Sequence, residues 1–161
     1  MTRRWVVNAS PLISLAKISQ LDLIVELCSE AIVPSGVVQE INSGTDDDPA
    51  KIWLRNKGNS LIRQVDTVHP LIAAWDLGLG ESQVLSVIYQ NSGYEAILDD
   101  RAAKNAAAAL RIPVRGTLGV ILFAKREGRL ESTRVLFEQL VGVGFRVSPE
   151  VLAAALQLVG E

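Results

Sequence analysis

The sequence is poor in residues that carry several common kinds of chemistry. It contains one cysteine, Cys28, and one histidine, His69, among 161 residues. A single cysteine excludes an internal disulfide framework and is typical of proteins kept in a reducing cytosol. His69 lies directly before a proline in a loop, where a histidine is more often structural than catalytic. Acid–base chemistry that depends on histidine is therefore not expected.

Long hydrophobic runs are also missing. The longest apolar run in the C-terminal half, residues 118–124, is far too short to cross a bilayer. Asn8 and Pro11 interrupt the apolar start of the chain, which excludes the core of a signal peptide. We find neither internal repeats nor low-complexity segments. The sequence therefore predicts one cytoplasmic domain over residues 1–161 that makes no use of a membrane.

Charge is small overall but unevenly distributed. The net charge of −2 argues against indiscriminate binding of nucleic acid. Residues 99–134, however, hold eight Lys or Arg and four acids, a net +4 against −6 for the remainder of the chain. A basic segment beside acidic residues suits a phosphodiester substrate that is bound with a metal ion. A set of solvated helix faces would have the same composition, and both interpretations stay open.

Short apolar segments alternate with helical patterns along the chain. This alternation predicts an α/β fold, a three-layer α/β/α sandwich around a central parallel sheet of order 3-2-1-4-5. Residues 131–161 are expected to form a C-terminal helical extension that packs on this sandwich. The five expected strands lie at residues 5–7, 31–33, 61–62, 96–98 and 112–114.

Polar side chains gather where strands end or helices begin. Asn8 follows the first strand, and the adjacent Asp99 and Asp100 follow the fourth. Glu40 lies at the edge of a buried helix face, and Glu81 lies in a first helical turn after two glycines. Ligands of parallel sheets bind beyond the carboxyl ends of the strands. Oxygen ligands without His or Cys suit Mg²⁺ or Mn²⁺, which would activate a water molecule against a phosphoryl group.

Simpler roles exist for several of these residues. Asp99 or Asp100 could cap the following helix, because Asp is a favoured N-cap residue. Two adjacent carboxylates repel by roughly 4 kcal/mol at about 4 Å and an effective dielectric constant near 20, so we expect a cation nearby. Arg101 and Lys104 lie one turn apart on that helix. Thr117 could either cap its own helix or donate to a phosphate at the helix N-terminus.

The motifs together resemble a known family. Residues 7–13, VNASPLI, resemble the opening of PIN-domain nucleases, whose first motif is an acid two residues before a Ser or Thr. Pro34 followed by Glu40 resembles their second acidic position. The remaining motifs resemble a branch of this family that is found beside antitoxin genes in prokaryotes. They lie at residues 80–81, 98–101, 116–119, 143–145 and 160–161. The resemblance extends over essentially the whole chain.

The resemblance implies a PIN fold and a ribonuclease activity that depends on Mg²⁺ or Mn²⁺. It also implies that the protein is the toxin of a type II toxin–antitoxin pair. Its partners would be RNA, a small antitoxin protein and a second copy of the chain. The implied catalytic positions are Asn8, Glu40, Glu81, Asp99 and Asp100, and all of these except Glu40 would ligate the metal. The implied RNA contacts are Ser10, Arg101, Lys104 and Thr117.

Asn8 departs from the family pattern, which has Asp at this position. Its amide oxygen can ligate a cation, but it carries no charge and cannot act as a base. This departure supports an alternative hypothesis, a PIN-like module that binds RNA or protein with weak or no nuclease activity. Between the adjacent acids, the sequence favours Asp100, directly before Arg101, as the family's fourth acid.

Overall fold

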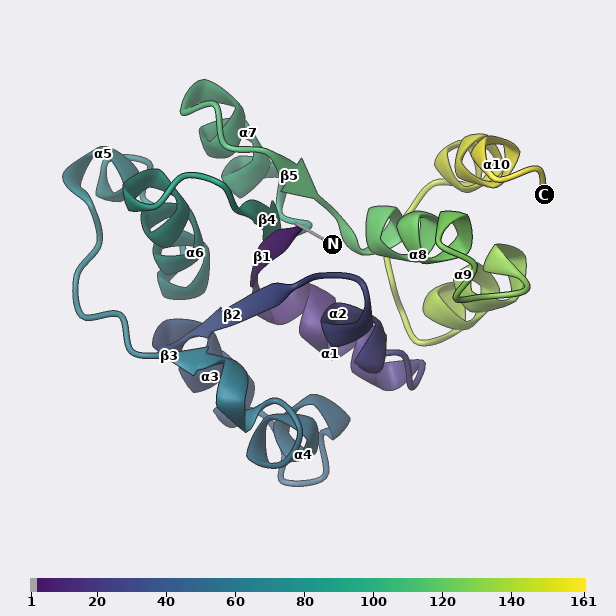
Figure 1. Cartoon of the computed structure of the whole chain (residues 1–161), viewed down its shortest axis with the longest axis horizontal. Coiled ribbons are helices and arrows are strands. Elements are labelled where there is room, and N and C mark those ends of the chain that lie inside the picture. Colours follow the sequence, from purple (N-terminus) through teal and green to yellow (C-terminus); the bar gives the residue numbers. More distant parts are fainter. Residues whose placement is uncertain (1–2) are drawn as a thin grey trace.

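A five-stranded sheet in which all strands run parallel forms the centre of the computed structural model, which describes residues 3–161 (Figure 1). The strand order is β3-β2-β1-β4-β5, so the predicted α/β class and sheet order are confirmed. Residues 1 and 2 of the expected domain lie outside the described part. The strands are β1 (Arg4–Val7), β2 (Glu30–Pro34), β3 (Ile62–Arg63), β4 (Glu95–Ile97) and β5 (Val114–Arg115).

Helices cover both faces of this sheet (Figure 1). Helices α3 and α6 pack on one face and α2 and α8 on the other, while α9 and α10 pack outside α8. None of the helices described is long and apolar enough to span a membrane. The helical elements are α1 (Ala9–Lys17), α2 (Asp22–Glu26), α3 (Ser35–Asn42), α4 (Pro49–Arg55), the 3₁₀ turn η1 (Asn59–Leu61), α5 (Pro70–Ala73), α6 (Leu79–Gln90), α7 (Arg101–Ala109), α8 (Thr117–Arg126), α9 (Thr133–Gly142) and α10 (Pro149–Leu158).

The central strand β1 is the most deeply buried part of the sheet. Trp5, Val6 and Val7 are completely inaccessible to solvent. The Trp5 indole N–H donates to Glu95 on β4 at 3.0 Å, and the ring of Phe123 on α8 meets Trp5 edge-on. A fully buried apolar strand of this kind is expected at the centre of a parallel sheet covered on both faces. Its packing fixes the position of the residues that follow β1.

Pairing at the carboxyl end of the sheet brings three chain segments together. Val7 pairs with Ile97, and the Asn8 amide N–H donates to the Ile97 carbonyl oxygen at 2.9 Å. On the other side of β4, the Leu98 amide N–H donates to the Arg115 carbonyl oxygen at 3.1 Å. The residues that follow β1, β4 and β5 therefore leave the sheet next to one another.

Several predicted boundaries are shifted by a few residues. Strand β4 spans Glu95–Ile97 rather than 96–98, and strand β3 spans Ile62–Arg63 rather than 61–62. Strand β5 begins at Val114, which pairs with Ala96, although the prediction started at the buried Ile112. Burial in an apolar run therefore does not by itself locate the paired residues of a strand.

Cys28 and His69 both have structural surroundings, which the sequence predicted for His69. Cys28 is buried, and its thiol donates to the Ile24 carbonyl oxygen at 2.9 Å. Burial raises the pKa of the Cys28 thiol to about 11, so little of the reactive thiolate exists at neutral pH. The Nδ1 of His69 accepts from the Leu71 N–H at 3.1 Å and so caps α5.

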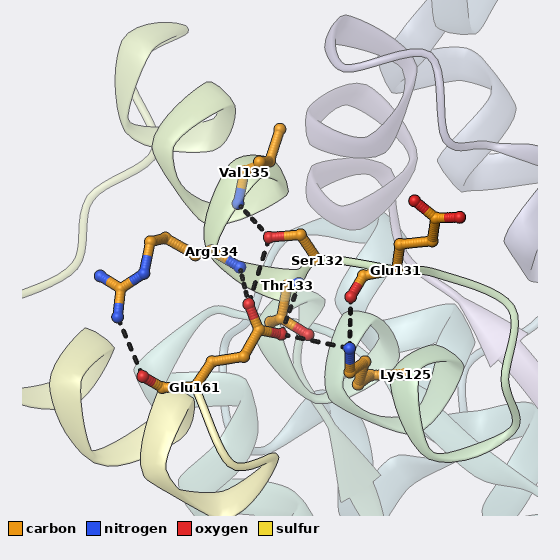
Figure 2. A network of polar contacts seen from close by, with 7 residues as sticks. All are labelled: Lys125, Glu131, Ser132, Thr133, Arg134, Val135 and Glu161. Atoms are coloured by element: carbon orange, nitrogen blue, oxygen red, sulfur yellow. Dashed lines mark hydrogen bonds and ion pairs between the residues drawn. The ribbon is translucent and has the colours of Figure 1, made fainter.

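The side chain of Glu161 connects the end of the chain to α8 and α9 (Figure 2). Its carboxylate accepts hydrogen bonds from the Thr133 N–H at 2.7 Å, the Arg134 N–H at 3.2 Å and the Ser132 hydroxyl at 3.1 Å. The Lys125 ammonium lies 3.6 Å away. These contacts, above all the Thr133 N–H, lower the pKa of Glu161 to about 2. The carboxylate therefore holds the segment after α10 against the first turn of α9.

At pH 7, the Glu161→Gln variant should have a melting temperature a few degrees below that of the parent protein. Because folding lowers the pKa of Glu161, its contribution is fully present above the ordinary value of 4.5 and disappears as the pH falls toward about 2. The difference between Glu161→Gln and parent should therefore shrink in calorimetric scans between pH 4.5 and pH 2. Glu138→Gln on the exposed face of α9 is the control for loss of one charge. A difference that stays constant with pH would contradict this interpretation.

Candidate active site

Asn8 places an unpaired amide oxygen at the carboxyl end of β1. The residue is 1% exposed and is the N-cap of α1, yet its side chain makes no capping hydrogen bond. Among the described residues, its Oδ1 has no hydrogen-bond partner. A buried acceptor left unpaired costs roughly 1–3 kcal/mol. This oxygen is therefore the atom that a bound cation, or an N–H group of a ligand, would satisfy.

Glu40 lies beside this oxygen, although it comes from a different helix. Its Oε1 accepts from the Gly80 N–H at 2.7 Å, in the first turn of α6. The N-terminus of a helix favours negative charge, which stabilises the carboxylate there. A Cβ atom at Gly80 would lie 2.7 Å from Glu40 Oε1 and 3.0 Å from Asn8 Oδ1. The structure therefore brings two predicted site residues together over the bare backbone of Gly80.

Asp99 is held at the carboxyl end of β4 by the start of α8. Its Oδ1 accepts from the Thr117 N–H at 2.8 Å, and its Oδ2 accepts from the Thr117 hydroxyl at 2.6 Å. The Ser10 hydroxyl lies 3.4 Å from the same Oδ2. The Asn8 N–H bonds to Ile97, two residues before Asp99, so Asn8 and Asp99 leave adjacent strands at the same end of the sheet. Thr117 is completely buried, and its hydroxyl donates to Asp99. The hydroxyl is therefore not presented at the surface, where the predicted contact with an RNA phosphate would be made.

Asp100 has a different environment from its neighbour Asp99. It is exposed, and it caps α7 by accepting a hydrogen bond from the Ala103 N–H at 2.9 Å. The capping interpretation thus holds for Asp100, while Asp99 is the acid that contacts other site residues. The preference for Asp100 as the fourth acid is not supported by this geometry.

The remaining predicted site residues lie on α6 and α7. Glu81 is half-buried, and its Oε2 lies 2.6 Å from the position that a Cβ on Gly78 would occupy. The side chain thus folds back over the start of α6, and in the described chain no hydrogen bond joins it to Asn8, Glu40 or Asp99. Arg101 and Lys104 are exposed on α7.

Sequence reasoning missed the role of Gly80. The sequence shows only that two glycines precede Glu81, whereas in the structure Gly80 lies inside α6 and matters because it has no side chain. Gly116 is similar, since a Cβ there would lie 3.0 Å from Asp99 Oδ1. For Gly80, the signal in the sequence was its place directly before a candidate acid, Glu81, at a helix start.

The donor atoms of the cluster fit a hard divalent cation. Within residues 3–161, no three His, Cys, Asp or Glu side chains gather closely enough to form a metal centre by themselves. The cluster does combine amide and carboxylate oxygens, which are the ligands that Mg²⁺ and Mn²⁺ prefer. The unpaired, buried Oδ1 of Asn8 beside the Glu40 carboxylate is the observation that supports the fit.

The sequence of the chain matches a known protein family over nearly its whole length. A family model described as a PIN domain matches residues 4–161. A search of curated proteins finds no match. The matched region runs from β1 to the end of the chain and contains every residue of the cluster described above.

Proposed function

Because this chain belongs to the PIN-domain family, we propose that it is a metal-dependent endoribonuclease that cleaves phosphodiester bonds of RNA. PIN domains are generally nucleases and typically use divalent metals. The observation that carries the proposal is the cluster at the carboxyl edge of the sheet. There, the unpaired oxygen of Asn8 lies beside Glu40, and Asp99 is held at the adjacent strand end.

Asn8, Glu40, Glu81 and Asp99 are the proposed residues for holding Mg²⁺ or Mn²⁺. A divalent ion bound there would supply Lewis-acid stabilisation of charge on the phosphate and would activate water near neutral pH. Glu40 and Asp99 are restrained from moving by hydrogen bonds that α6 and α8 donate. Such restraint keeps the ligands in place at little entropic cost when an ion binds.

The carboxylates must supply any proton acceptor at this site. Asn8 cannot accept a proton, so the base that receives one from the attacking water is Glu40, Glu81 or Asp99. Asp99 is the least free of the three, because the Thr117 N–H and hydroxyl occupy both of its oxygens. We therefore assign Asp99 to ligand binding and leave proton transfer to Glu40 or Glu81.

The proposed substrate is RNA that reaches the cluster along α7. Arg101 and Lys104 are exposed there, in the segment that carries a net +4 charge. Positive side chains bind phosphates and raise the local concentration of a polyanion, with an affinity that falls as salt rises. The motifs that resemble the antitoxin-associated branch support a further proposal, that a small partner protein holds the activity in check and that the chain pairs with a second copy.

The direct test is cleavage of a panel of single-stranded RNAs by the purified protein. We expect fragments in the presence of Mn²⁺ or Mg²⁺, loss of cleavage with excess EDTA, and recovery when Mn²⁺ is restored. Asp99→Asn purified in parallel identifies any contaminating nuclease, because a contaminant would remain active in that preparation. Cleavage that persists in EDTA would contradict the metal-dependent mechanism.

Asn8 favours a second candidate function, a PIN-like module that binds RNA or protein and cleaves weakly or not at all. The site then has one negative charge fewer than the family pattern provides, which weakens attraction for a cation. RNA binding in the same assays without fragments at any metal concentration would support this candidate over the nuclease.

A further inference from the structure

The side chains of Lys104 and Asp99 both come close to Gly116. A Cβ atom at position 116 would lie 3.0 Å from Asp99 Oδ1 and 3.5 Å from Lys104 Nζ. The space that a side chain would fill is therefore bordered by a carboxylate from the end of β4 and an ammonium group from α7. No direct ion pair joins these two described groups.

The ammonium group of Lys104 lies near the same carboxylate that is proposed to hold the metal. Both oxygens of Asp99 accept a hydrogen bond from Thr117, so this carboxylate is already stabilised without the ammonium group of Lys104. A lysine side chain is long and flexible, and its ammonium can approach the carboxylate or withdraw from it. An arriving divalent cation would be repelled by this ammonium and would compete with it for Asp99.

We propose that Lys104 is an internal counter-ion of Asp99 and sets the concentration of divalent metal at which the site becomes loaded. The inference rests on the proposed function, because it takes Asp99 as a metal ligand. It goes further in giving Lys104 a role toward the metal in addition to contact with RNA. Lys104 is a positioning residue in this sense, because it acts through Asp99.

The two roles of Lys104 have opposite consequences when its charge is removed. A lysine that only contacts RNA would weaken RNA binding on substitution and would leave metal binding unchanged. A counter-ion of Asp99 would, when removed, make the site bind a divalent cation more tightly in the complete absence of RNA. Metal binding without RNA is therefore the measurement that separates them.

The experiment is a thermal-shift titration of the full chain with Mn²⁺, without RNA, for the parent and Lys104→Met. The variant should reach half-maximal stabilisation at a Mn²⁺ concentration about three- to tenfold lower than the parent, because a positive charge near the ion has been removed. Lys104→Arg keeps the charge and should stay close to the parent. Arg129→Met is the control for net charge, since Arg129 lies beyond the end of α8 opposite to Thr117.

Each outcome of the titration gives a clear decision. A lower midpoint for Lys104→Met, with Arg129→Met and Lys104→Arg like the parent, supports the counter-ion role. Equal midpoints for the parent and Lys104→Met overturn it, and weaker RNA binding by that variant would then identify a simple phosphate contact. No stabilisation of any protein by Mn²⁺ overturns the proposed function itself, and the counter-ion role with it.

Discussion

Asp99→Asn should reduce the rate of RNA cleavage by on the order of a hundredfold or more, while Asp100→Asn should leave it within a few-fold of the parent. Loss of a group that only orients a metal ligand typically costs 10- to 100-fold, and loss of a charged ligand should reach at least the upper end of that range. The two variants make the same chemical change at adjacent positions. Their difference therefore reports the position of each carboxylate and excludes a general effect of charge.

The hydrogen bonds of the two carboxylates explain the expected difference. Asp99 accepts from both the N–H and the hydroxyl of Thr117, and an amide in its place would turn a donor group toward one of these donors. Asp100 is exposed and only caps α7, and Asn is as good an N-cap residue as Asp. We therefore expect a lower melting temperature for Asp99→Asn and a nearly unchanged one for Asp100→Asn.

Cleavage rates at saturating Mn²⁺, together with circular dichroism of each variant, check this prediction. The spectra ensure that Asp99→Asn is folded at the assay temperature. Equal loss of activity in both variants would show that the acidic pair acts as a unit. Full activity of Asp99→Asn would remove this residue from the site.

The sequence could not separate these two acids, because the choice depends on where α7 begins. One hydrogen bond, from the Ala103 N–H to Asp100, makes Asp100 the N-cap and turns Asp99 toward Thr117 instead. Helix boundaries inferred from sequence are uncertain by more than the single residue that matters here. The neighbouring strand was easier to predict, because apolar residues followed by acids indicate the carboxyl end of a buried strand.

The sheet order was predictable, but the way Asn8 and Glu40 come close together over Gly80 was not. Short apolar strands alternating with helices leave few possible topologies, and the carboxyl ends of β1 and β4 then lie together. Glu40, in contrast, lies near Asn8 only because α3 packs against α6 and Gly80 leaves room for the carboxylate. That arrangement depends on how two helices pack, and no local pattern in the sequence encodes it.

Asn8→Asp should strengthen the response to divalent metal and raise the rate of cleavage. A carboxylate at this position would direct a negative charge, in place of a neutral oxygen, toward the space shared with Glu40. An added attraction of about 1.4 kcal/mol is a tenfold change in affinity, and we expect a Mn²⁺ midpoint lower by about this factor. Without metal, two carboxylates would face each other in a buried setting, so the variant should then melt at a lower temperature than the parent.

The decisive comparison is melting temperature and cleavage rate against Mn²⁺ concentration for the parent, Asn8→Asp and the control Asn59→Asp. Asn59 lies in η1, just before β3, and therefore at the amino end of the parallel strands, away from the site at their carboxyl end. The control variant thus reports the effect of one added negative charge alone. A variant that is less stable than the parent without metal and gains more from Mn²⁺ would identify the unpaired oxygen of Asn8 as a ligand position. If Asn8→Asp matches the parent while Asp99→Asn is inactive, Asn8 does not ligate the metal. If both variants match a parent that binds RNA without cutting it, the binding module replaces the nuclease as the function of this chain.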